Sequence, residues 1–182
     1  MCHDSFRRRN LPYYGAYIMI RLATYDDFDA ILDMCEEFWG HTQFDEPFER
    51  DHAENMVQLS FDQGLLLVAD DGGVFGVIFA IKSPLIGSTK AWTATEIAWW
   101  VNPKKRGKLA GVQLIAHLER LCIEQEVKYL NLAYMQSSMP DTVRKLYEKL
   151  GYKLQETLYT KVLYGFDNSG NYSGGSGPTR GL

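Results

Sequence analysis

The sequence predicts an α/β fold in which a sheet of mixed strand direction is flanked by helices. Strand-like apolar runs alternate along the chain with apolar residues at helical spacing, Gly and Pro punctuate them, and no internal repeat is visible. The expected order of elements is β-α-α-β-β-β-α-β-α, followed by one or two strands. A chain of 182 residues, of which 46% are apolar and 23% charged, suits one domain with its own core.

The first half is expected to form a strand, two helices and a hairpin. Residues 17–23 predict a strand, and Thr24 before an acidic first turn is typical of a helix N-cap. The helix that follows has apolar residues at helical spacing, at Phe28, Ile31, Leu32, Cys35 and Phe38. A second helix is expected over about 47–61, and two apolar runs within 65–81, separated by Asp-Asp-Gly-Gly, predict the hairpin.

The second half alternates strands and helices before a polar tail. The expected elements are a strand over 93–101, a helix over 109–122, a strand over 129–135, a helix over 141–150 that ends at Gly151, and one or two strands within 152–164. We expect residues 1–18 to be a flexible N-terminal extension and 19–164 to be the domain. Residues 165–182, rich in Gly, Ser and Asn, predict a disordered tail.

Bulk properties exclude several classes of protein. A net charge of -4 argues against broad electrostatic binding of nucleic acid. The three Cys form no CxxC pair and the four His form no ligand spacing, so we expect neither a disulfide framework nor a metal. No apolar run approaches the ~20 residues of a membrane span. We therefore expect a soluble cytoplasmic protein without a membrane partner; a homodimer remains open.

A basic loop lies between the strand over 93–101 and the helix after it. It reads Val101-Asn102-Pro103-Lys104-Lys105-Arg106-Gly107-Lys108-Leu109-Ala110-Gly111-Val112. The N–H groups and dipole of a helix start bind anions, nearby Arg and Lys add charge, and Gly permits close approach. A pyrophosphate would fit here, although an isolated basic loop is more often only solvated.

A second motif favours phosphate binding over a merely solvated loop. The segment Arg144-Lys145-Leu146-Tyr147-Glu148-Lys149-Leu150-Gly151-Tyr152 follows the basic loop at a distance of one strand and one loop. Together the two motifs resemble the GCN5-related N-acetyltransferase (GNAT) family, over about residues 19–163. The sequence departs from the family pattern at Leu109, where the family has Gly, and at Pro140, where it often has Asn.

The resemblance implies a single-domain fold with two splayed parallel strands, here about 94–101 and 129–135, and acetyl-CoA as cosubstrate between them. It implies that the pantetheine arm pairs with the backbone of one strand and that the pyrophosphate lies on the basic loop. The implied cofactor-binding residues are Trp99, Trp100, Val101, Arg106, Gly107, Lys108, Leu109, Ala110, Gly111 and Val112.

Two residues are candidates for proton transfer. Tyr147 is the candidate acid, since a phenol with a pKa near 10 suits protonation of a departing thiolate. Without the resemblance it would be interpreted as a core Tyr. Glu96 is the candidate base, because a carboxylate within an apolar strand needs a partner, solvent or a chemical role. A salt-bridged or edge-facing Glu is an equally good interpretation, since a bulge would change its face.

The segment over 24–54 is rich in acidic residues and in aromatic residues such as Phe38, Trp39, Phe44 and Phe48. In the family this region helps to shape the acceptor site. Acidic and aromatic groups together suit a cationic amine. Alternatively, much of this charge only solvates the outer face of a helix.

The function predicted is transfer of an acetyl group from acetyl-CoA to a primary amine, on a small molecule or a protein, by direct attack in a ternary complex. The alternative is a catalytically silent acyl-CoA-binding or protein-interaction domain on the same fold, which the departures at Leu109 and Pro140 keep open. An unrelated α/β interaction domain would bind no CoA at all.

Overall fold

A computed structural model describes residues 18–107, 109–162, 164–166 and 172–174. The predicted N-terminal extension therefore falls almost wholly outside the described residues. The chain divides into two compact units, with the division between Pro140 and Asp141. Each unit is described by itself below.

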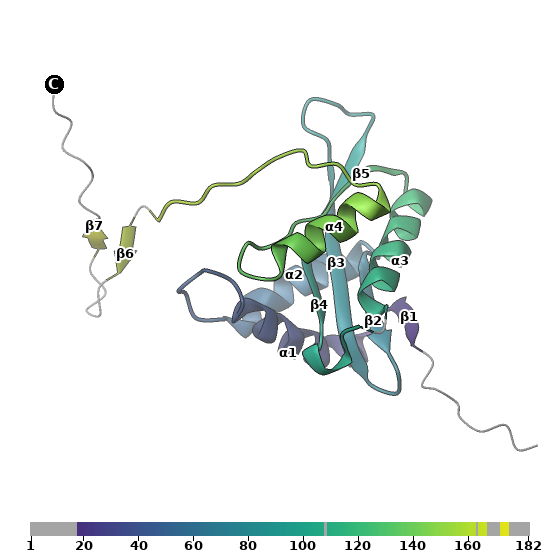
Figure 1. The fold of residues 1–182 in the computed structure, drawn as a ribbon, viewed down its shortest axis with the longest axis horizontal. Coiled ribbons are helices and arrows are strands. Elements are labelled where there is room, and N and C mark those ends of the chain that lie inside the picture. The colour runs from purple at the N-terminus through teal and green to yellow at the C-terminus, as the bar shows by residue number, and fades with distance from the viewer. Residues whose placement is uncertain (1–17, 108, 163, 167–171, 175–182) are drawn as a thin grey trace, which may run out of the picture. The chain divides into compact units, whose positions relative to one another are not determined.

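The first unit is built on a five-stranded sheet with the order β1-β2-β3-β4-β5 (Figure 1). Neighbouring strands are antiparallel except for β4 and β5, which are parallel. The strands are β1 Met19–Leu22, β2 Leu66–Asp70, β3 Val74–Pro84, β4 Trp92–Val101 and β5 Val127–Asn131. The α/β class, the mixed sheet and the predicted hairpin are thereby confirmed.

Three helices cover this sheet, α1 and α2 on one face and α3 on the other (Figure 1). The helices are α1 Phe28–Trp39, α2 Arg50–Asp62 and α3 Ala110–Glu124, and short 3-10 turns occupy η1 Tyr25–Asp27 and η2 Pro103–Lys105. The start expected for the second helix was three residues too early, because Pro47, Phe48 and Glu49 still belong to the connection. No helix in the described ranges has the length and apolar character needed to traverse a bilayer.

The core on the α1 and α2 face gathers apolar side chains from both helices and from alternate positions of the central strands. Its strand members include Leu66 and Val68 from β2, Val77 and Phe79 from β3, and Ala98 and Trp100 from β4. On the opposite face Leu114 of α3 lies near Gly76 of β3, where a Cβ would come within 3.4 Å of the leucine. This two-sided burial explains the continuous apolar runs of β2 and β3.

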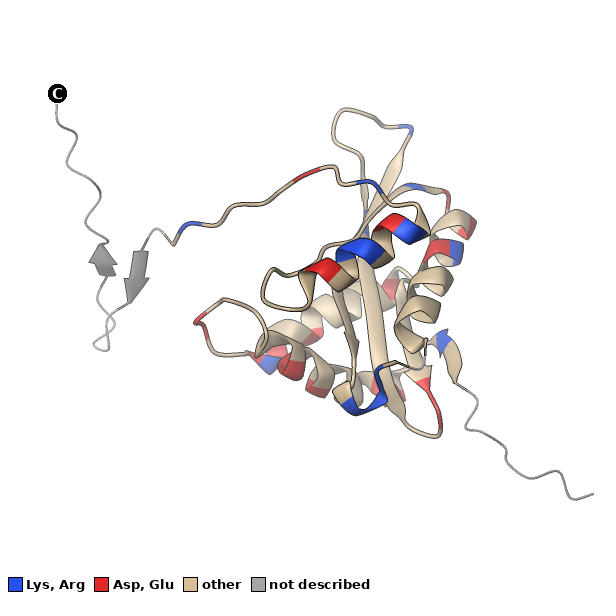
Figure 2. Ribbon diagram, viewed as in Figure 1, with Lys and Arg blue, Asp and Glu red and all other residues tan. Residues whose placement is uncertain are grey.

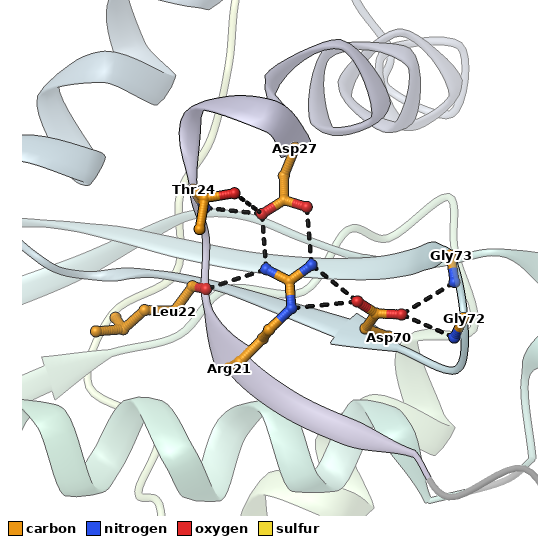
Figure 3. Close-up of polar contacts among 7 residues, drawn as sticks. All are labelled: Arg21, Leu22, Thr24, Asp27, Asp70, Gly72 and Gly73. Carbon is orange, nitrogen blue, oxygen red and sulfur yellow. Dashed lines mark hydrogen bonds and ion pairs between the residues drawn. The ribbon is translucent and has the colours of Figure 1, made fainter.

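An ion-pair network fastens β1 to the start of α1 and to the β2–β3 turn (Figure 3). The Arg21 guanidinium donates to both oxygens of Asp27, at 2.7 and 2.8 Å, and to Asp70 Oδ2 at 2.8 Å. Asp27 also accepts from the Thr24 backbone N–H at 2.7 Å, and Asp70 accepts from Gly72 and Gly73. These hydrogen bonds, chiefly that from Arg21, lower the pKa of Asp27 to about 2.

The second unit contains α4 Pro140–Leu150 and a short antiparallel ribbon formed by β6 Tyr164–Phe166 and β7 Tyr172–Gly174. Gly151 ends α4 with a φ of 92°, as predicted for its C′ position. The strands expected within 152–164 are not found over 152–162, where Leu158 and Tyr159 are each 90% exposed. The ribbon begins at Tyr164, the last residue of the expected strand range, and otherwise lies within 165–182, where no order was expected.

The Arg21 network predicts an acid-dependent loss of stability. Replacing Asp27, whose side chain is 8% exposed, by Asn should lower the free energy of unfolding by about 2 kcal/mol near neutral pH. Because the folded-state pKa is depressed, this stabilisation is present above about pH 4 and is lost as the pH falls toward 2. Urea unfolding of wild type and Asp27→Asn at pH 7, 4 and 2 measures the difference.

Asp29→Asn is the matched control, since Asp29 pairs with Arg50 at the surface and its side chain is 97% exposed. This control should leave the unfolding midpoint unchanged at every pH. A deficit in Asp27→Asn that stays constant down to pH 2 would contradict the depressed pKa.

Candidate active site

The parallel pairing of β4 with β5 stops halfway along β4. The pairs run from Trp92 opposite Val127 to Thr95 opposite Asn131, whereas β4 continues beside β3 as far as Val101. From Glu96 onward, β4 therefore has a neighbour on one edge only among the described strands. This confirms the predicted splay of two parallel strands.

The backbone of β4 presents alternate amide groups to this opening. Asn102 N–H donates to Phe75 O across the β3 edge at 2.9 Å. Since backbone groups alternate in direction along a strand, Trp100 also faces β3, and the groups of Trp99 and Val101 face the opening. Arg106 Nε donates to Val101 O at 2.9 Å, which occupies one of these groups and leaves the Val101 N–H directed into the opening.

A β-bulge decides where Glu96 points. Phe79 is opposite Ala98 while Ala80 is opposite Glu96, so Ile97 is an extra residue in β4. Without it Glu96 would share the face of Ala98 in the α1 and α2 core. With it, Glu96 shares the opposite face with Ala80, which resolves the ambiguity left by the sequence.

Glu96 reaches across the gap between the splayed strands. Its Oε2 accepts a hydrogen bond from Ala133 N–H, just beyond β5, at 3.1 Å. The side chain is half-buried, and its removal from water raises the pKa to about 7, although the bond from Ala133 acts in the opposite direction. A carboxyl group with this pKa can exchange a proton near neutral pH, as a general base must.

The basic loop forms the turn from β4 into α3. Asn102 caps η2 by accepting from Lys104 N–H at 3.0 Å, and the chain then passes through Gly107 with a φ of 87°. The first bond of α3 runs from Gln113 N–H to Leu109 O at 2.9 Å. The preceding N–H groups, including that of Val112, therefore belong to the helix end that can receive an anion. Lys108 lies outside the described residues.

Two cationic side chains of the loop, those of Lys105 and Arg106, are engaged by the protein. Arg106 Cζ lies 4.4 Å from the ring centroid of Trp100, in addition to its bond with Val101 O. Lys105 Nζ pairs with Asp71 at 2.6 Å. The loop therefore offers an anion its backbone donors and a local excess of positive charge. Its basic residues appear as blue ribbon at the end of β4 in Figure 2.

The conformation at Leu109 explains why the family pattern has Gly there. Leu109 has a φ of 64°, in the left-handed region, and its side chain is 68% exposed. A non-Gly residue in this region costs about 1 kcal/mol or more. Where the family has Gly, this chain thus has a strained Leu at the N-cap of α3, in a backbone conformation that suits Gly.

Gly111 serves packing rather than backbone freedom. A Cβ at this position would lie 2.8 Å from Cζ2 of Trp99, so only Gly lets this indole lie against the first turn of α3. The predicted cofactor residue therefore also fixes the distance between α3 and β4.

The connection after α1, residues 40–49, lies beside β4. His41 lies with its ring centroid 4.9 Å from that of Trp100, and its carbonyl accepts from Ser137 Oγ at 2.9 Å. Trp39 stacks on Phe44 at 5.5 Å. Sequence reasoning missed the contacts of His41, Ser137 and Ala133, since nothing in their local sequence indicates them.

Part of the acidic segment is neutralised within the fold. Asp27 pairs with Arg21, while Asp29 and Asp33 both pair with Arg50 at the surface. Glu37 Oε2 accepts a hydrogen bond from the indole N–H of Trp100 at 3.0 Å, a donor that brings no opposing charge. The local field is therefore weaker than the count of acidic residues predicts.

Tyr147 belongs to the second unit, on α4. It is 7% exposed, its ring centroid lies 5.7 Å from that of Tyr152, and its carbonyl accepts from Tyr152 N–H at 3.0 Å. The structure thus brings together Glu96, Trp99 to Val101 and the basic loop within the first unit. Among the described residues no group of His, Cys, Asp and Glu could hold a metal ion.

A family model described as the acetyltransferase (GNAT) family matches residues 27–152. The chain belongs to this family. Comparison with curated proteins gives no significant match.

Solved structures of similar fold agree with this assignment. An aminoglycoside N-acetyltransferase in complex with CoA is 17% identical, with a TM-score of 0.65 over 84% of this chain and 98% of that one. A ribosomal-protein-alanine N-acetyltransferase from Brucella melitensis is 21% identical, with a TM-score of 0.63 over 80% and 98%. A predicted acetyltransferase with acetyl-CoA from Clostridium acetobutylicum is 12% identical, with a TM-score of 0.64 over 81% and 97%.

The strain at Leu109 gives a prediction of sign. Leu109→Gly should raise the free energy of unfolding by up to about 1 kcal/mol, because Gly adopts a positive φ without the steric penalty. Leu109→Val should lower it, because a β-branched side chain fits this region less well than Leu. Urea titration of the three proteins tests the order Gly, Leu, Val; a Gly variant less stable than wild type would contradict it.

Proposed function

We propose that the protein is an N-acetyltransferase that moves the acetyl group of acetyl-CoA to a primary amine by direct attack in a ternary complex. The observation that carries this proposal is the position of Glu96. Its carboxyl group has a pKa raised to about 7 and lies at the point where β4 loses its parallel neighbour. Family membership supports acetyl transfer as the reaction and acetyl-CoA as the cosubstrate.

The first unit offers donors that fit acetyl-CoA. The pantetheine amides would pair with the groups of β4 that face the opening, as an added strand does, with the Val101 N–H as one donor. The pyrophosphate would lie against the N–H groups that open α3. Space exists for its approach at Gly107, where a Cβ would meet nothing within 4 Å.

The reaction needs two proton transfers and one oxyanion donor. Glu96, directly or through water, would take the proton that the amine must lose to become a nucleophile. The neutral amine then attacks the thioester carbonyl, and a backbone N–H stabilises the tetrahedral oxyanion. The C–S bond breaks, and the departing thiolate takes a proton from Tyr147, the proposed acid. Proximity of the two bound substrates supplies much of the remaining acceleration.

The acceptor is proposed to be a cationic amine, on a small molecule or a protein. The carboxyl group of Glu37, bound to Trp100 of β4, and the stacked rings of Trp39 and Phe44 favour a positive group. Among proteins of similar fold, one is named for aminoglycosides and another for a ribosomal-protein alanine.

The test of function is release of free CoA thiol from acetyl-CoA across a panel of aminoglycosides, polyamines and peptides with free α- or ε-amines. We expect acetyl-CoA to raise the melting temperature by mass action, and turnover to favour cationic amines and to fall with added salt. Binding without turnover on any amine would favour the catalytically silent alternative. No shift at millimolar acetyl-CoA would contradict both.

The role of Glu96 predicts a pH profile. Since a base must be deprotonated, kcat/KM corrected for the ionisation of the amine should fall about tenfold per unit below pH 7 and level off above it. Glu96→Gln keeps an oxygen that can accept from Ala133 but cannot take a proton, so turnover should fall about 10²- to 10⁴-fold. A Gln variant with an unchanged profile would show that another group is the base.

A further inference from the structure

Two loops that are far apart in the sequence meet on one indole ring. Trp100 is 5% exposed, and its ring lies 4.9 Å from that of His41, in the connection after α1. The guanidinium of Arg106, at the start of the basic loop, lies 4.4 Å from the same ring. The side of the site proposed for the acceptor and the side proposed for the cofactor thus share one contact surface.

The core holds the indole in place. Its Nε1–H donates to Glu37 Oε2 at 3.0 Å, and the ring of Phe38 meets it edge-on at 6.3 Å. Trp100 also belongs to the buried cluster on the α1 and α2 face. A ring with these restraints transmits a displacement on one side to its other contact instead of absorbing it.

Each of the two loops is also tied elsewhere. Arg106 Nε donates to Val101 O at 2.9 Å, so this side chain determines where the basic loop leaves β4. The carbonyl of His41 accepts from Ser137 Oγ at 2.9 Å, in the chain segment whose Ala133 N–H reaches Glu96. His41 is therefore held against the indole and does not simply rest on it.

We propose that His41 is a positioning residue for the basic loop: through Trp100 it holds the Arg106 side chain, and it thereby sets the affinity for acetyl-CoA from the acceptor side. This inference rests on the proposed function, because it takes acetyl-CoA as the ligand of the loop. Coupling between two sites is reciprocal. An acceptor that presses His41 onto the indole raises the affinity for acetyl-CoA. Bound acetyl-CoA raises the affinity for that acceptor by the same factor.

A double-mutant cycle on acetyl-CoA binding tests the coupling without a known acceptor. His41 and Arg106 are both exposed, so His41→Ala, Arg106→Ala and the double variant should all fold, and the melting temperature of each without ligand checks this. The dissociation constant of acetyl-CoA is measured by calorimetry. We expect His41→Ala to weaken binding about three- to fivefold in the wild-type background, the size of one aromatic contact.

In the Arg106→Ala background the same His41→Ala change should have no effect, because the connection is already broken. Gln43→Ala, at an exposed position in the same connection, is the control and should leave affinity unchanged in both backgrounds. An unaltered affinity in His41→Ala, or an equal loss in both backgrounds, would overturn the inference and leave the proposed function intact. A wild-type protein that binds no acetyl-CoA would overturn both.

Discussion

The site depends on one feature of the sheet: β4 loses its parallel neighbour after Thr95 but keeps its antiparallel neighbour through Val101. A strand with one paired edge is held in the sheet by that edge, yet presents backbone donors and acceptors on its other edge. In most proteins such an edge invites aggregation. Here the edge lies inside the sheet, between two strands, and becomes a place for an extended ligand.

The two adjacent tryptophans of β4 connect this edge to its surroundings on both faces of the sheet. Trp99 lies against the first turn of α3, where Gly111 leaves room for it, and Trp100 lies among α1, the connection after it and Arg106. One strand thereby positions α3, proposed to receive the pyrophosphate, together with the connection proposed to line the acceptor site. The strained Leu109 stands at the N-cap of the helix that this packing positions.

Periodicity and turn chemistry predicted most of the fold. The β2–β3 hairpin, α1, α3 and α4 were found close to their expected positions because each has a strong local pattern with a clear stop signal. The strands expected within 152–164 were not found over 152–162, because a strand needs a pairing partner that the sequence does not reveal. The start of α2 was placed early because Pro is common in the first turn of a helix. Pro47 instead belongs to the connection that precedes the helix.

The site was only partly predictable. Glu96 stood out as a carboxylate in an apolar strand, but its direction depends on the bulge at Ile97, which has no local signature. The charge of Arg106 was evident, whereas its attachment to Val101 O and Trp100 arises from tertiary contacts. The negative charge of the acidic segment was overestimated. Arg21 and Arg50 neutralise three of its acidic residues, and these pairs form only when the chain folds.

The hydrogen bond from Ala133 to Glu96 means that the proposed base also links β4 to the segment just after β5. A protonated carboxyl group accepts a weaker hydrogen bond than a carboxylate. The proton that Glu96 takes before the attack would therefore weaken this hydrogen bond, and the bond would still be weak when the acetylated product has to leave. Release of that proton to water would strengthen the bond again for the next turnover. Proton transfer and the link between β4 and the segment after β5 would thus depend on the same carboxyl group.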